Sequence, residues 1–515
     1  MNAILPNGSQ ENVNTGIRAP KLGVSLALLL AGSLLVGFSM GRWLAPLAAW
    51  IGPALILRYS RDHKGWLGYP LVLVAYTLAF IIGFMAMWLG AGWPLPLVAI
   101  LPVFYGFLWS VPYLADRLVG TRLTGFSSTL VYPLAATTLE FVNNHTNPIG
   151  VWGATGFTQY GDIPIMQLAS VTGMIGITFL MGWFASVTNW VWENRGRRAE
   201  MLRGLAVFVA VLAVVFIFGF VRLNLAPSSE TVRVAGITAE SAHTVALTVG
   251  ERLSGAQDPA AVARPLFESH LDAYFAATPR EARAGAQVVV WPEVTGMAFE
   301  SEEAPFIARA QEVARQNGVY LAVPLWIWDP GALRPIENKL LVIDPTGAIV
   351  IEHIKYGGNI VEGTLLGDGK LQAVTTPFGV LSGVICWDAD YPTIIQQVGQ
   401  NGTGLLLVPS SDWREIDPLH GHMAVFRAIE NGTSLVRQTD NGLSIAVDAY
   451  GRVLAQTDFF GSTDRTMVAQ VPVKHVTTLY TAFGRWFEWV CLIGFLFVIA
   501  YVVARALIAR RRAHT

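Results

Sequence analysis

Gly383-Val384-Ile385-Cys386-Trp387-Asp388 is an apolar run that leads directly into a cysteine and an acidic residue. The β-branched residues predict a buried strand, and the polar residues after them place Cys386 at the end of that strand. Side chains at such ends can project into a cleft between loops. In isolation, the cysteine has an ordinary explanation as a small buried hydrophobic residue.

Two further polar residues follow strand-like runs earlier in the same region. Trp291-Pro292-Glu293 comes after the apolar run 288–290, and its proline ends the strand. Lys355 closes another predicted strand and precedes Gly357. Taken alone, Glu293 has an ordinary explanation as a paired carboxylate, and Lys355 has one as a surface lysine. Together, a thiol nucleophile, a base to deprotonate it and a cation to stabilise an oxyanion are what thiol-based acyl chemistry requires.

The region from about 230 to 475 alternates short β-branched runs with helical stretches. The predicted strands are Val232–Ile237, Gln287–Trp291, Tyr320–Leu325, Lys339–Ile343, Ile349–His353, Val380–Cys386, Gly404–Val408, Leu435–Gln438 and Ser444–Val447. The predicted helices include Leu266–Ala277, Pro305–Gln316 and His420–Asn431. Asp344–Gly347 and Asp448–Gly451 predict hairpin turns, because glycine tolerates positive φ. We therefore expect an α/β domain with mixed sheets covered by helices.

The remainder of the chain is strongly apolar and predicts an α-helical membrane bundle. Hydrophobic residues make up 53% of the 515 residues and charged residues 14%, whereas soluble proteins have about 25% charged residues. A membrane helix needs roughly 20 mostly apolar residues. About eight spans are expected, near 22–39, 43–57, 69–90, 94–115, 123–142, 165–192, 203–222 and 487–508. A cleaved signal peptide at Leu22–Gly37 is less favoured, because no clear cleavage site appears and further spans follow at once.

Basic residues predict the orientation of this bundle. Most fall on one side if eight helices alternate: Arg18, Lys21, Arg58, Arg61, Lys64, Arg117, Arg122, Arg195, Arg197, Arg198, Arg203 and Arg510–Arg512. Arg42 and Arg222 are the exceptions. By the positive-inside rule both termini are expected in the cytoplasm, and 225–485 on the periplasmic or extracytoplasmic face. The net charge of −1 gives no reason to expect a nucleic-acid partner. The two cysteines, Cys386 and Cys491, make no disulfide framework.

These observations divide the chain into three expected parts. The first, 1–225, is an N-terminal membrane domain of about seven helices. The second, 226–476, is an extracytoplasmic catalytic domain. The third, 477–515, is a C-terminal membrane helix with a basic cytoplasmic tail.

The catalytic region resembles the nitrilase (carbon–nitrogen hydrolase) superfamily, in which Glu, Lys and Cys occur in this order. The resemblance implies an αββα sandwich and the catalytic residues Glu293, Lys355 and Cys386. It continues downstream through Asp412-Trp413, Pro418, His420, His422, Arg427–Gly432, Val436–Gly442 and Asp448–Arg452.

A domain of this kind before the last of eight spans is similar to the apolipoprotein N-acyltransferases. Residues that agree with that family are Glu140, Gly150, Trp152, Gly156, Gln159, Gln167, Gly173, Gly176–Leu180, Thr478, Tyr480, Gly484 and Trp486. The resemblance implies a bacterial inner-membrane enzyme that moves an acyl chain from a membrane phospholipid to a diacylated apolipoprotein through a Cys thioester, with no cofactor and no metal. Glu362, Trp387 and Asp388 are then expected to support the site, and Glu140, Trp291, Trp326 and Trp328 to contact substrate.

The sequence also departs from the family pattern. The loop after Lys355 lacks the usual Pro-Phe-Gly-Glu and reads 356–362, with Glu362 at nearly the right distance. Trp387-Asp388 replaces the common Tyr-Glu, and the Arg expected shortly after Glu140 is absent. Two other functions stay open: a membrane-anchored amidase or nitrilase that hydrolyses a C–N bond, and a catalytically inactive membrane scaffold.

Overall fold

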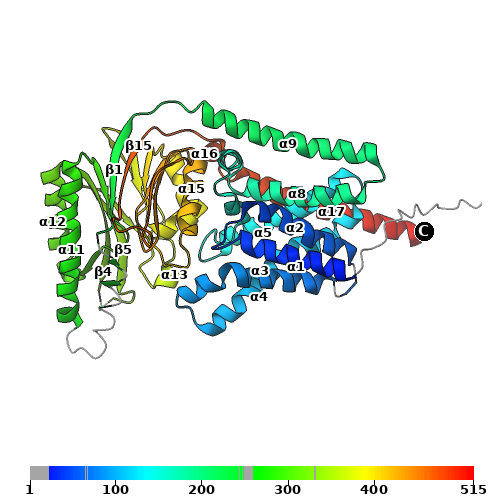
Figure 1. Ribbon diagram of the computed structural model, residues 1–515, viewed down its shortest axis with the longest axis horizontal. Coiled ribbons are helices and arrows are strands. Elements are labelled where there is room, and N and C mark those ends of the chain that lie inside the picture. The colour runs from blue at the N-terminus through cyan, green and yellow to red at the C-terminus, as the bar shows by residue number, and fades with distance from the viewer. Residues whose placement is uncertain are drawn as a thin grey trace, which may run out of the picture.

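The computed structural model describes residues 22–514 except 64, 67, 240, 243, 246, 247, 249–258, 330 and 331. An α/β domain lies at one end of the molecule and a bundle of long helices at the other, with the C-terminus farthest from the α/β domain (Figure 1). The long helices of the bundle are α1 (Leu22–Ser39), α2 (Pro46–Asp62), α3 (Gly68–Gly90), α4 (Leu95–Leu118), α5 (Val131–Thr146), α8 (Ile175–Glu193), α9 (Arg198–Asn224) and α17 (Trp486–His514). The short helices among them are η1 (Gly120–Arg122), η2 (Phe126–Leu130), η3 (Thr155–Gln159), α6 (Ile163–Met166), α7 (Ala169–Thr172) and α16 (Leu479–Phe483).

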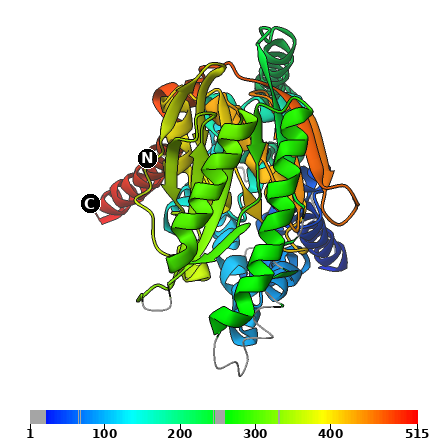
Figure 2. The ribbon, with the colours of Figure 1, turned by 90° about the vertical axis from the view of Figure 1, so that its left-hand side faces the viewer.

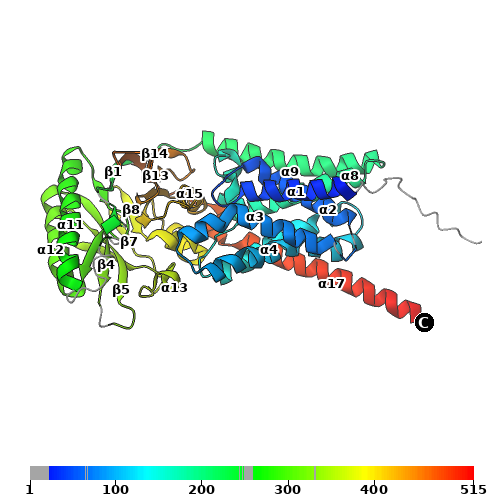
Figure 3. The same cartoon turned by 60° about the horizontal axis from the view of Figure 1, so that its bottom comes forward.

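The apolar helices are consistent with a membrane bundle. Within the described residues, five helices are long and apolar enough to cross a membrane, or up to six if the bent pair Ile163–Thr172 and Ile175–Glu193 forms one span. Each of the eight expected spans overlaps a helix, but α2 and α5 have only 17 and 16 residues. The number of spans therefore stays a prediction. Helices α9 and α17 run along the outside of the bundle (Figure 3).

Partly buried ion pairs join three helices at the end of the bundle that lies away from the α/β domain. Arg61 on α2 binds Asp116 on α4 at 2.8 Å. Arg58 on α2 binds Glu193 on α8 at 3.0 Å. The basic residues that predict the orientation of the bundle thus also hold its helices together. Arg18, Lys21 and Lys64 lie outside the described residues.

The α/β domain contains two large sheets. The first has seven strands and the order β15-β1-β2-β4-β5-β6, with β3 paired to β4. Its strands are β1 (Thr231–Ile237), β2 (Val288–Val290), β3 (Gly296–Phe299), β4 (Tyr320–Trp328), β5 (Ile336–Ile343), β6 (Ile349–Ile354) and β15 (Thr466–Pro472). The second has six strands in the order β14-β13-β11-β9-β8-β7. Its strands are β7 (Ala373–Thr376), β8 (Gly379–Gly383), β9 (Leu405–Leu407), β11 (Ser434–Arg437), β13 (Leu443–Val447) and β14 (Val453–Asp458). A short parallel pair, β10 (Ser410–Ser411) and β12 (Thr439–Asp440), lies beside them.

Alternating side chains build an αββα sandwich. Val289 faces the core that the first sheet shares with α11 (Pro259–Arg283) and α12 (Glu300–Asn317). Val288 and Val290 belong to the other core, which also contains Leu407 of the second sheet. This period of two is the expected consequence of strand geometry. Helices α11 and α12 cover the outer face of the first sheet, as Figure 2 shows. The remaining helices are α13 (Asn359–Glu362), η4 (Cys386–Asp390), α14 (Pro392–Gln400) and α15 (Leu419–Asn431).

Several hydrogen bonds join the α/β domain to the helical bundle. Trp413 donates from Nε1 to the carbonyl of Met87 at the end of α3, at 3.1 Å. The backbone N–H of Met174, just before α8, donates to Glu430 of α15 at 2.8 Å. The second sheet and α15 thus lie directly against the bundle.

The expected strands and helices of the α/β domain are confirmed. Each of the nine predicted strands overlaps an observed one, and the three predicted helices lie within α11, α12 and α15. Both predicted turns join antiparallel neighbours, β5 with β6 and β13 with β14. Strand β8 ends at Gly383, three residues earlier than expected. A Cβ at Gly383 would lie 2.6 Å from Cδ2 of Leu340 in the first sheet, so the two sheets approach closely there and a larger residue would displace the leucine side chain.

The packing between the two sheets predicts that removing a buried side chain there will destabilise the protein. Leu407 is fully buried next to Gly383 in the register of β8 and β9. Leu407→Ala is expected to destabilise the protein by about 2–5 kcal/mol, because the rigid sheets cannot close the space. Thermal unfolding of the detergent-purified protein measures this. Val453→Ala on β14, where the side chain is 44% exposed, is the control and should be nearly neutral. Equal shifts for both variants would contradict the packing described.

Candidate active site

A fully buried lysine forms the centre of the site. Lys355 follows β6 directly, and its Nζ lies 2.6 Å from Oε1 of Glu293. It also forms an ion pair with Glu362 of the short helix α13. Burial acts to lower the pKa of the Lys355 amine, but Glu293 and Glu362 outweigh it and hold that pKa well above its usual value. Lys355 is therefore a permanent cation, and two of the three residues expected to be catalytic are in direct contact.

Separate segments fix the carboxylate of Glu293. Asn338 of β5 donates from Nδ2 to Oε1 at 2.7 Å. The backbone N–H of Ser411 donates to Oε2 at 2.9 Å. Glu293 is thus held by the first sheet and by the short strand β10, and it lines the same cavity as Cys386.

Cys386 lies in a sharp turn between β8 and η4. Its backbone N–H donates to the carbonyl of Pro409 at 3.0 Å, and its Sγ lies 3.7 Å from the carbonyl oxygen of Ser411. The φ of Cys386 is +46° and that of Val294, next to Glu293, is +68°. Positive φ is unusual for residues other than glycine, above all for a β-branched one, and such positions cluster at functional sites.

The carboxylate of Asp388 joins the cysteine turn to the lysine loop. Oδ1 accepts hydrogen bonds from the backbone N–H groups of Tyr356 (2.9 Å) and Gly357 (2.7 Å). Oδ2 accepts from the N–H of Ile385 (2.9 Å) and from Nε2 of His353 (2.8 Å). Burial acts to raise the pKa of Asp388, but His353 and the backbone donors outweigh it and lower that pKa. Asp388 thus holds the residues next to Cys386 and those next to Lys355 together, and its supporting role in catalysis stays a prediction.

The thiol is protonated in the resting site. Burial and the charge of Glu293 raise the pKa of Cys386, while His420 and Lys355 act to lower it. Burial also raises the pKa of Glu362 to about 6, against the opposing effect of Lys355. A protonated thiol beside a carboxylate that is held in place suits base-assisted attack on a carbonyl carbon.

A cavity of about 260 Å³ opens onto these groups. Five residues predicted to belong to the site line it: Glu293, Glu362, Cys386, Trp387 and Trp326. Lys355 lies behind Glu293 and does not line the cavity. Trp291 does not line it either, because its ring packs under α11 and donates from Nε1 to Thr278 at 3.0 Å. Trp328 is also absent from the lining and stacks on Phe299.

Three smaller apolar cavities continue from this one into the helical bundle. The first shares Trp93, Trp387 and Trp413 with the site cavity, and its lining is largely aromatic. The second shares Phe84 and Gly153 with the first. The third shares Tyr76, Trp109 and Thr155 with the second, and Glu140 lines it. Glu140, which the sequence places in contact with substrate, therefore lies in the bundle, away from Cys386.

The carboxylate of Glu140 has partners within the bundle. The hydroxyl of Thr178 donates to its Oε2 at 2.8 Å, and the backbone N–H of Thr155 donates to its Oε1 at 2.9 Å. These bonds join α5 to η3 and α8, so part of its role is structural.

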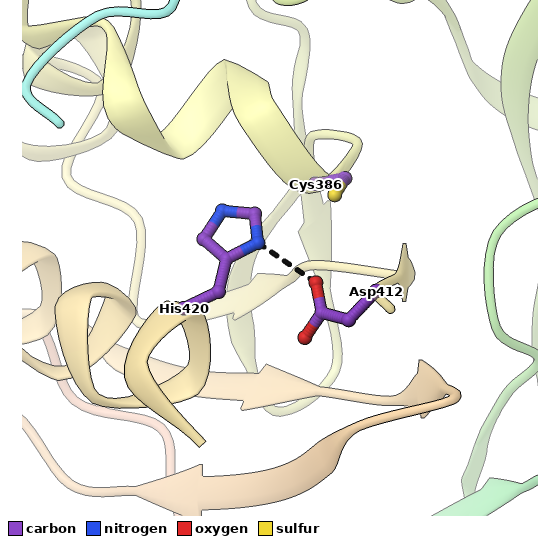
Figure 4. A group of neighbouring side chains, drawn as sticks. All are labelled: Cys386, Asp412 and His420. Carbon is purple, nitrogen blue, oxygen red and sulfur yellow. Dashed lines mark hydrogen bonds and ion pairs between the residues drawn. The ribbon is translucent and has the colours of Figure 1, made fainter. Parts of the chain in front are cut away.

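A second polar cluster lies beside Cys386, and no catalytic role was predicted for its residues. Asp412 and His420 lie with Cys386 so that one ligand-type atom of each is within 4.8 Å of the others (Figure 4). Arg437 binds both carboxylate oxygens of Asp412, at 2.8 and 2.9 Å. These donors do not suit a cation, because a guanidinium already occupies the carboxylate. Asp412 and His420 belong to the downstream residues that resemble the nitrilase superfamily. The sequence around a histidine on a helix, however, does not indicate which distant residues will contact it.

Comparisons with known proteins agree with this architecture. The family model described as "Apolipoprotein N-acyltransferase N-terminal domain" matches residues 30–187, and that described as "Carbon-nitrogen hydrolase" matches 254–480. A curated apolipoprotein N-acyltransferase of Geobacter metallireducens is 24% identical over 525 residues, covering 95% of this chain and 96% of that protein. One of Gloeobacter violaceus is 26% identical over 500 residues and covers 90% of each chain. A solved amidase structure from Nesterenkonia covers 48% of this chain at 19% identity, with a TM-score of 0.37.

The class of protein that follows is a carbon–nitrogen hydrolase domain joined to a bundle of apolar membrane helices. Both family models match in the expected order, and the relatives align over nearly the whole chain. The chain belongs to the apolipoprotein N-acyltransferase family of the nitrilase superfamily, and it is an acyltransferase of a bacterial membrane.

The four hydrogen bonds that Asp388 accepts predict how much it stabilises the contact between the turn at Cys386 and the loop after Lys355. Asp388→Asn keeps the size of the side chain but removes the charge, and it is expected to destabilise the protein by about 3 kcal/mol. The difference in thermal unfolding from wild type measures this at pH 7. It should shrink only as the pH falls below about 4, because a carboxylate whose pKa is lowered by folding keeps its contribution above its unfolded pKa and loses it as it is protonated in the folded protein.

Asp272→Asn is the control for this substitution. Asp272 is 66% exposed and pairs with the exposed Arg309, and such surface pairs contribute about 0–1 kcal/mol. An Asp388→Asn variant as stable as this control would show that Asp388 does not hold the two loops together.

Proposed function

We propose that this enzyme transfers an acyl chain from a membrane phospholipid to the N-terminal amine of a diacylglyceryl-cysteine apolipoprotein. The observation that carries the proposal is the cavity at Cys386, which contains Glu293 and leads into apolar cavities between membrane helices. A thiol and a fixed carboxylate supply the chemistry. The apolar continuation supplies space for an acyl chain, which suits a donor that resides in the bilayer.

In the first half-reaction, Glu293 accepts the proton of the Cys386 thiol. The thiolate attacks the ester carbonyl carbon of the phospholipid. The backbone N–H of Trp387 donates to the oxyanion, and the positive charge of the buried Lys355 stabilises it electrostatically without direct contact. The glycerol oxygen leaves with the proton from Glu293, so a lysophospholipid departs and Cys386 carries a thioester. Lys355 keeps Glu293 oriented between these two proton transfers.

In the second half-reaction, the α-amino group of the acceptor attacks the thioester carbonyl carbon. Glu293 takes one proton from the attacking amine and returns it to the departing sulfur. The products are an amide-linked acyl chain and the free thiol. No cofactor and no metal ion takes part in either step.

The walls of the site cavity suggest how an ester is oriented. The indole Nε1 of Trp387 is buried and has no hydrogen-bond partner among the described residues. A buried donor without a partner is costly, so an ester oxygen of the substrate would find a ready partner there. Trp326 and Trp93 on the same walls offer flat apolar surfaces for the glycerol and the acyl chain.

The positions of the basic residues suggest how the enzyme is oriented in the membrane. Arg58 and Arg61 lie at the end of the bundle remote from Cys386, and the basic residues 510–512 end the chain on that side. We infer that this end and both termini face the cytoplasm. The α/β domain then lies on the periplasmic face, where the acyl donor and the anchored acceptor share the outer leaflet.

An amidase or nitrilase that uses water as the acyl acceptor is the second candidate, because the same three residues would serve it. Incubation with a fluorescent phospholipid and a diacylated lipopeptide distinguishes the two. Acyl transfer to the peptide supports our proposal, whereas ammonia released from small amides supports hydrolysis. An inactive scaffold would give neither product and would leave Cys386 unreactive towards thiol probes.

Glu293→Gln tests the base. The amide keeps the size of the side chain and an oxygen for Lys355, but it cannot accept the thiol proton, so acyl-enzyme formation should slow by about 100-fold or more. Mass spectrometry of Cys386 after mixing with phospholipid measures the rate. Cys386→Ala is the matched blank and should carry no adduct. An unchanged rate in Glu293→Gln would exclude Glu293 as the base.

Ala91→Phe tests the path of the acyl chain. Ala91 lines both the site cavity and the aromatic cavity behind it, so a larger side chain there should block the passage. We expect acylation of Cys386 by a long-chain phospholipid to slow by about tenfold or more, which corresponds to about 1.4 kcal/mol of lost binding.

Two controls accompany this variant. Ala91→Ser should keep the wild-type rate, and alkylation of Cys386 by iodoacetamide should be equal in all three proteins. Wild-type acylation in Ala91→Phe would show that the chain takes another path.

A further inference from the structure

His420 is a buried histidine whose two ring nitrogens both face carboxylates. Its Nδ1 lies 2.8 Å from Oδ1 of Asp412, and its Nε2 lies 2.9 Å from Oδ2 of Asp390. An ionised carboxylate only accepts hydrogen bonds, so each nitrogen donates to the carboxylate that it faces. Nη2 of Arg437 also lies 3.0 Å from Nδ1, but it donates to Oδ1 of Asp412 at the shorter distance of 2.8 Å. A ring that donates from both nitrogens is an imidazolium. The three side chains of His420, Asp412 and Cys386 lie together in Figure 4.

The charges around this ring balance only if it is positive. The charged groups that face it among the described residues are Asp390 from η4, Asp412 after β10 and Arg437 from β11. Arg437 compensates Asp412 through two hydrogen bonds, which leaves Asp390 to be compensated by His420. Burial acts to lower the pKa of His420, but Asp390 and Asp412 outweigh it and hold that pKa well above its usual value.

The thiol of Cys386 lies next to this cation. Its Sγ is within 4.8 Å of the nearest atoms of His420 and Asp412 that could bind a metal. A metal does not fit, because an imidazolium has no free lone pair and Arg437 occupies Asp412. A positive charge at this distance from sulfur favours the thiolate over the thiol.

We propose that His420 is a positioning residue that keeps a permanent positive charge beside Cys386 and so stabilises the thiolate, in addition to Lys355. The inference rests on the proposed role of Cys386 as nucleophile. In this account Glu293 moves the proton, Lys355 orients Glu293, and His420 stabilises the charge that appears on sulfur in both half-reactions. His420 itself neither gives nor takes a proton.

The membrane part of the protein holds this charge in place. Trp152, in the turn between α5 and η3, donates from Nε1 to Oδ2 of Asp390 at 2.9 Å. Its ring centroid lies 5.1 Å from that of His420, and the backbone N–H of Val151 donates to the carbonyl of Asp390 at 3.0 Å. Asp390 therefore receives bonds from both the bundle and α15. The charge beside Cys386 depends on the contact between the two parts of the chain.

The test measures how readily Cys386 ionises. A Cys491→Ser background leaves Cys386 as the one cysteine of the chain. The rate of alkylation by uncharged iodoacetamide follows the thiolate fraction, so its dependence on pH reports the pKa of the thiol. In His420→Gln the amide keeps a hydrogen-bond donor but loses the charge. The titration should therefore shift to higher pH by on the order of one unit, with alkylation about tenfold slower at neutral pH.

A matched control lies one half-turn away on the same helix. His422 also lies on α15, where it is half-buried and stacks on Tyr160 with ring centroids 3.6 Å apart. His422→Gln removes an imidazole from the same helix and should leave the titration of Cys386 unchanged. Equal titration shifts in both variants would show that disturbance of α15, and not the lost charge, causes the effect, and would overturn the proposal.

Two further outcomes test the proposed role of His420. An unchanged titration in a His420→Gln protein that unfolds at the wild-type temperature overturns the proposal. If His420→Gln does not fold, Trp152→Phe carries the test. Loss of the indole donor leaves Asp390 a stronger acceptor for His420 but less well fixed, and the proposal then requires an altered titration of Cys386. No lipid is needed, so failure here is distinct from failure of the acyl-transfer proposal.

Discussion

A lysine that is entirely buried is the constraint on which the rest of the site depends. A buried ammonium is tolerated only when opposite charges and acceptors surround it. Lys355 meets this need with Glu293 at the end of one strand and Glu362 in the next loop. Asn338 of the first sheet and the backbone of Ser411 in the short strand β10 then fix Glu293. The ends of β2, β6 and β9 must converge for these bonds to form, and convergence places Cys386 at the same cavity.

The position of this cavity joins the chemistry to the membrane. The second sheet and α15 lie against the bundle, and Trp413 is bonded to the end of α3. The aromatic cavity behind Trp387 shares lining residues with the site cavity, and we propose that the acyl chain enters there from the bilayer. The same contact orders Asp390 through Trp152. The contact between the α/β domain and the bundle therefore holds the domain in place, borders the proposed path of the substrate and fixes a charged group near Cys386.

Periodicity and strand-end chemistry predicted much of this from the sequence. The nine strands and the set of Glu293, Lys355 and Cys386 followed from local patterns, because each residue stands directly after an apolar run. The network around His420 did not, since its partners come from η4, the β10 loop and β11, and Trp152 is 238 residues away from Asp390. Trp291 shows a different limit of sequence-based prediction, because a local pattern does not reveal towards which side a ring points. Its place beside Glu293 suggested substrate contact, but strand alternation turns its ring into the core under α11.

The central claim is that the acyl chain resides on the sulfur of Cys386 between donor and acceptor. A pulse–chase experiment with a phospholipid labelled in its acyl chain tests it most directly. Without acceptor, we expect the label on the peptide containing Cys386, in a bond cleaved by neutral hydroxylamine. After excess diacylated lipopeptide is added, the label should move from that peptide to the lipopeptide amine in equal amount. Label that reaches the lipopeptide without first residing on Cys386 would contradict the account.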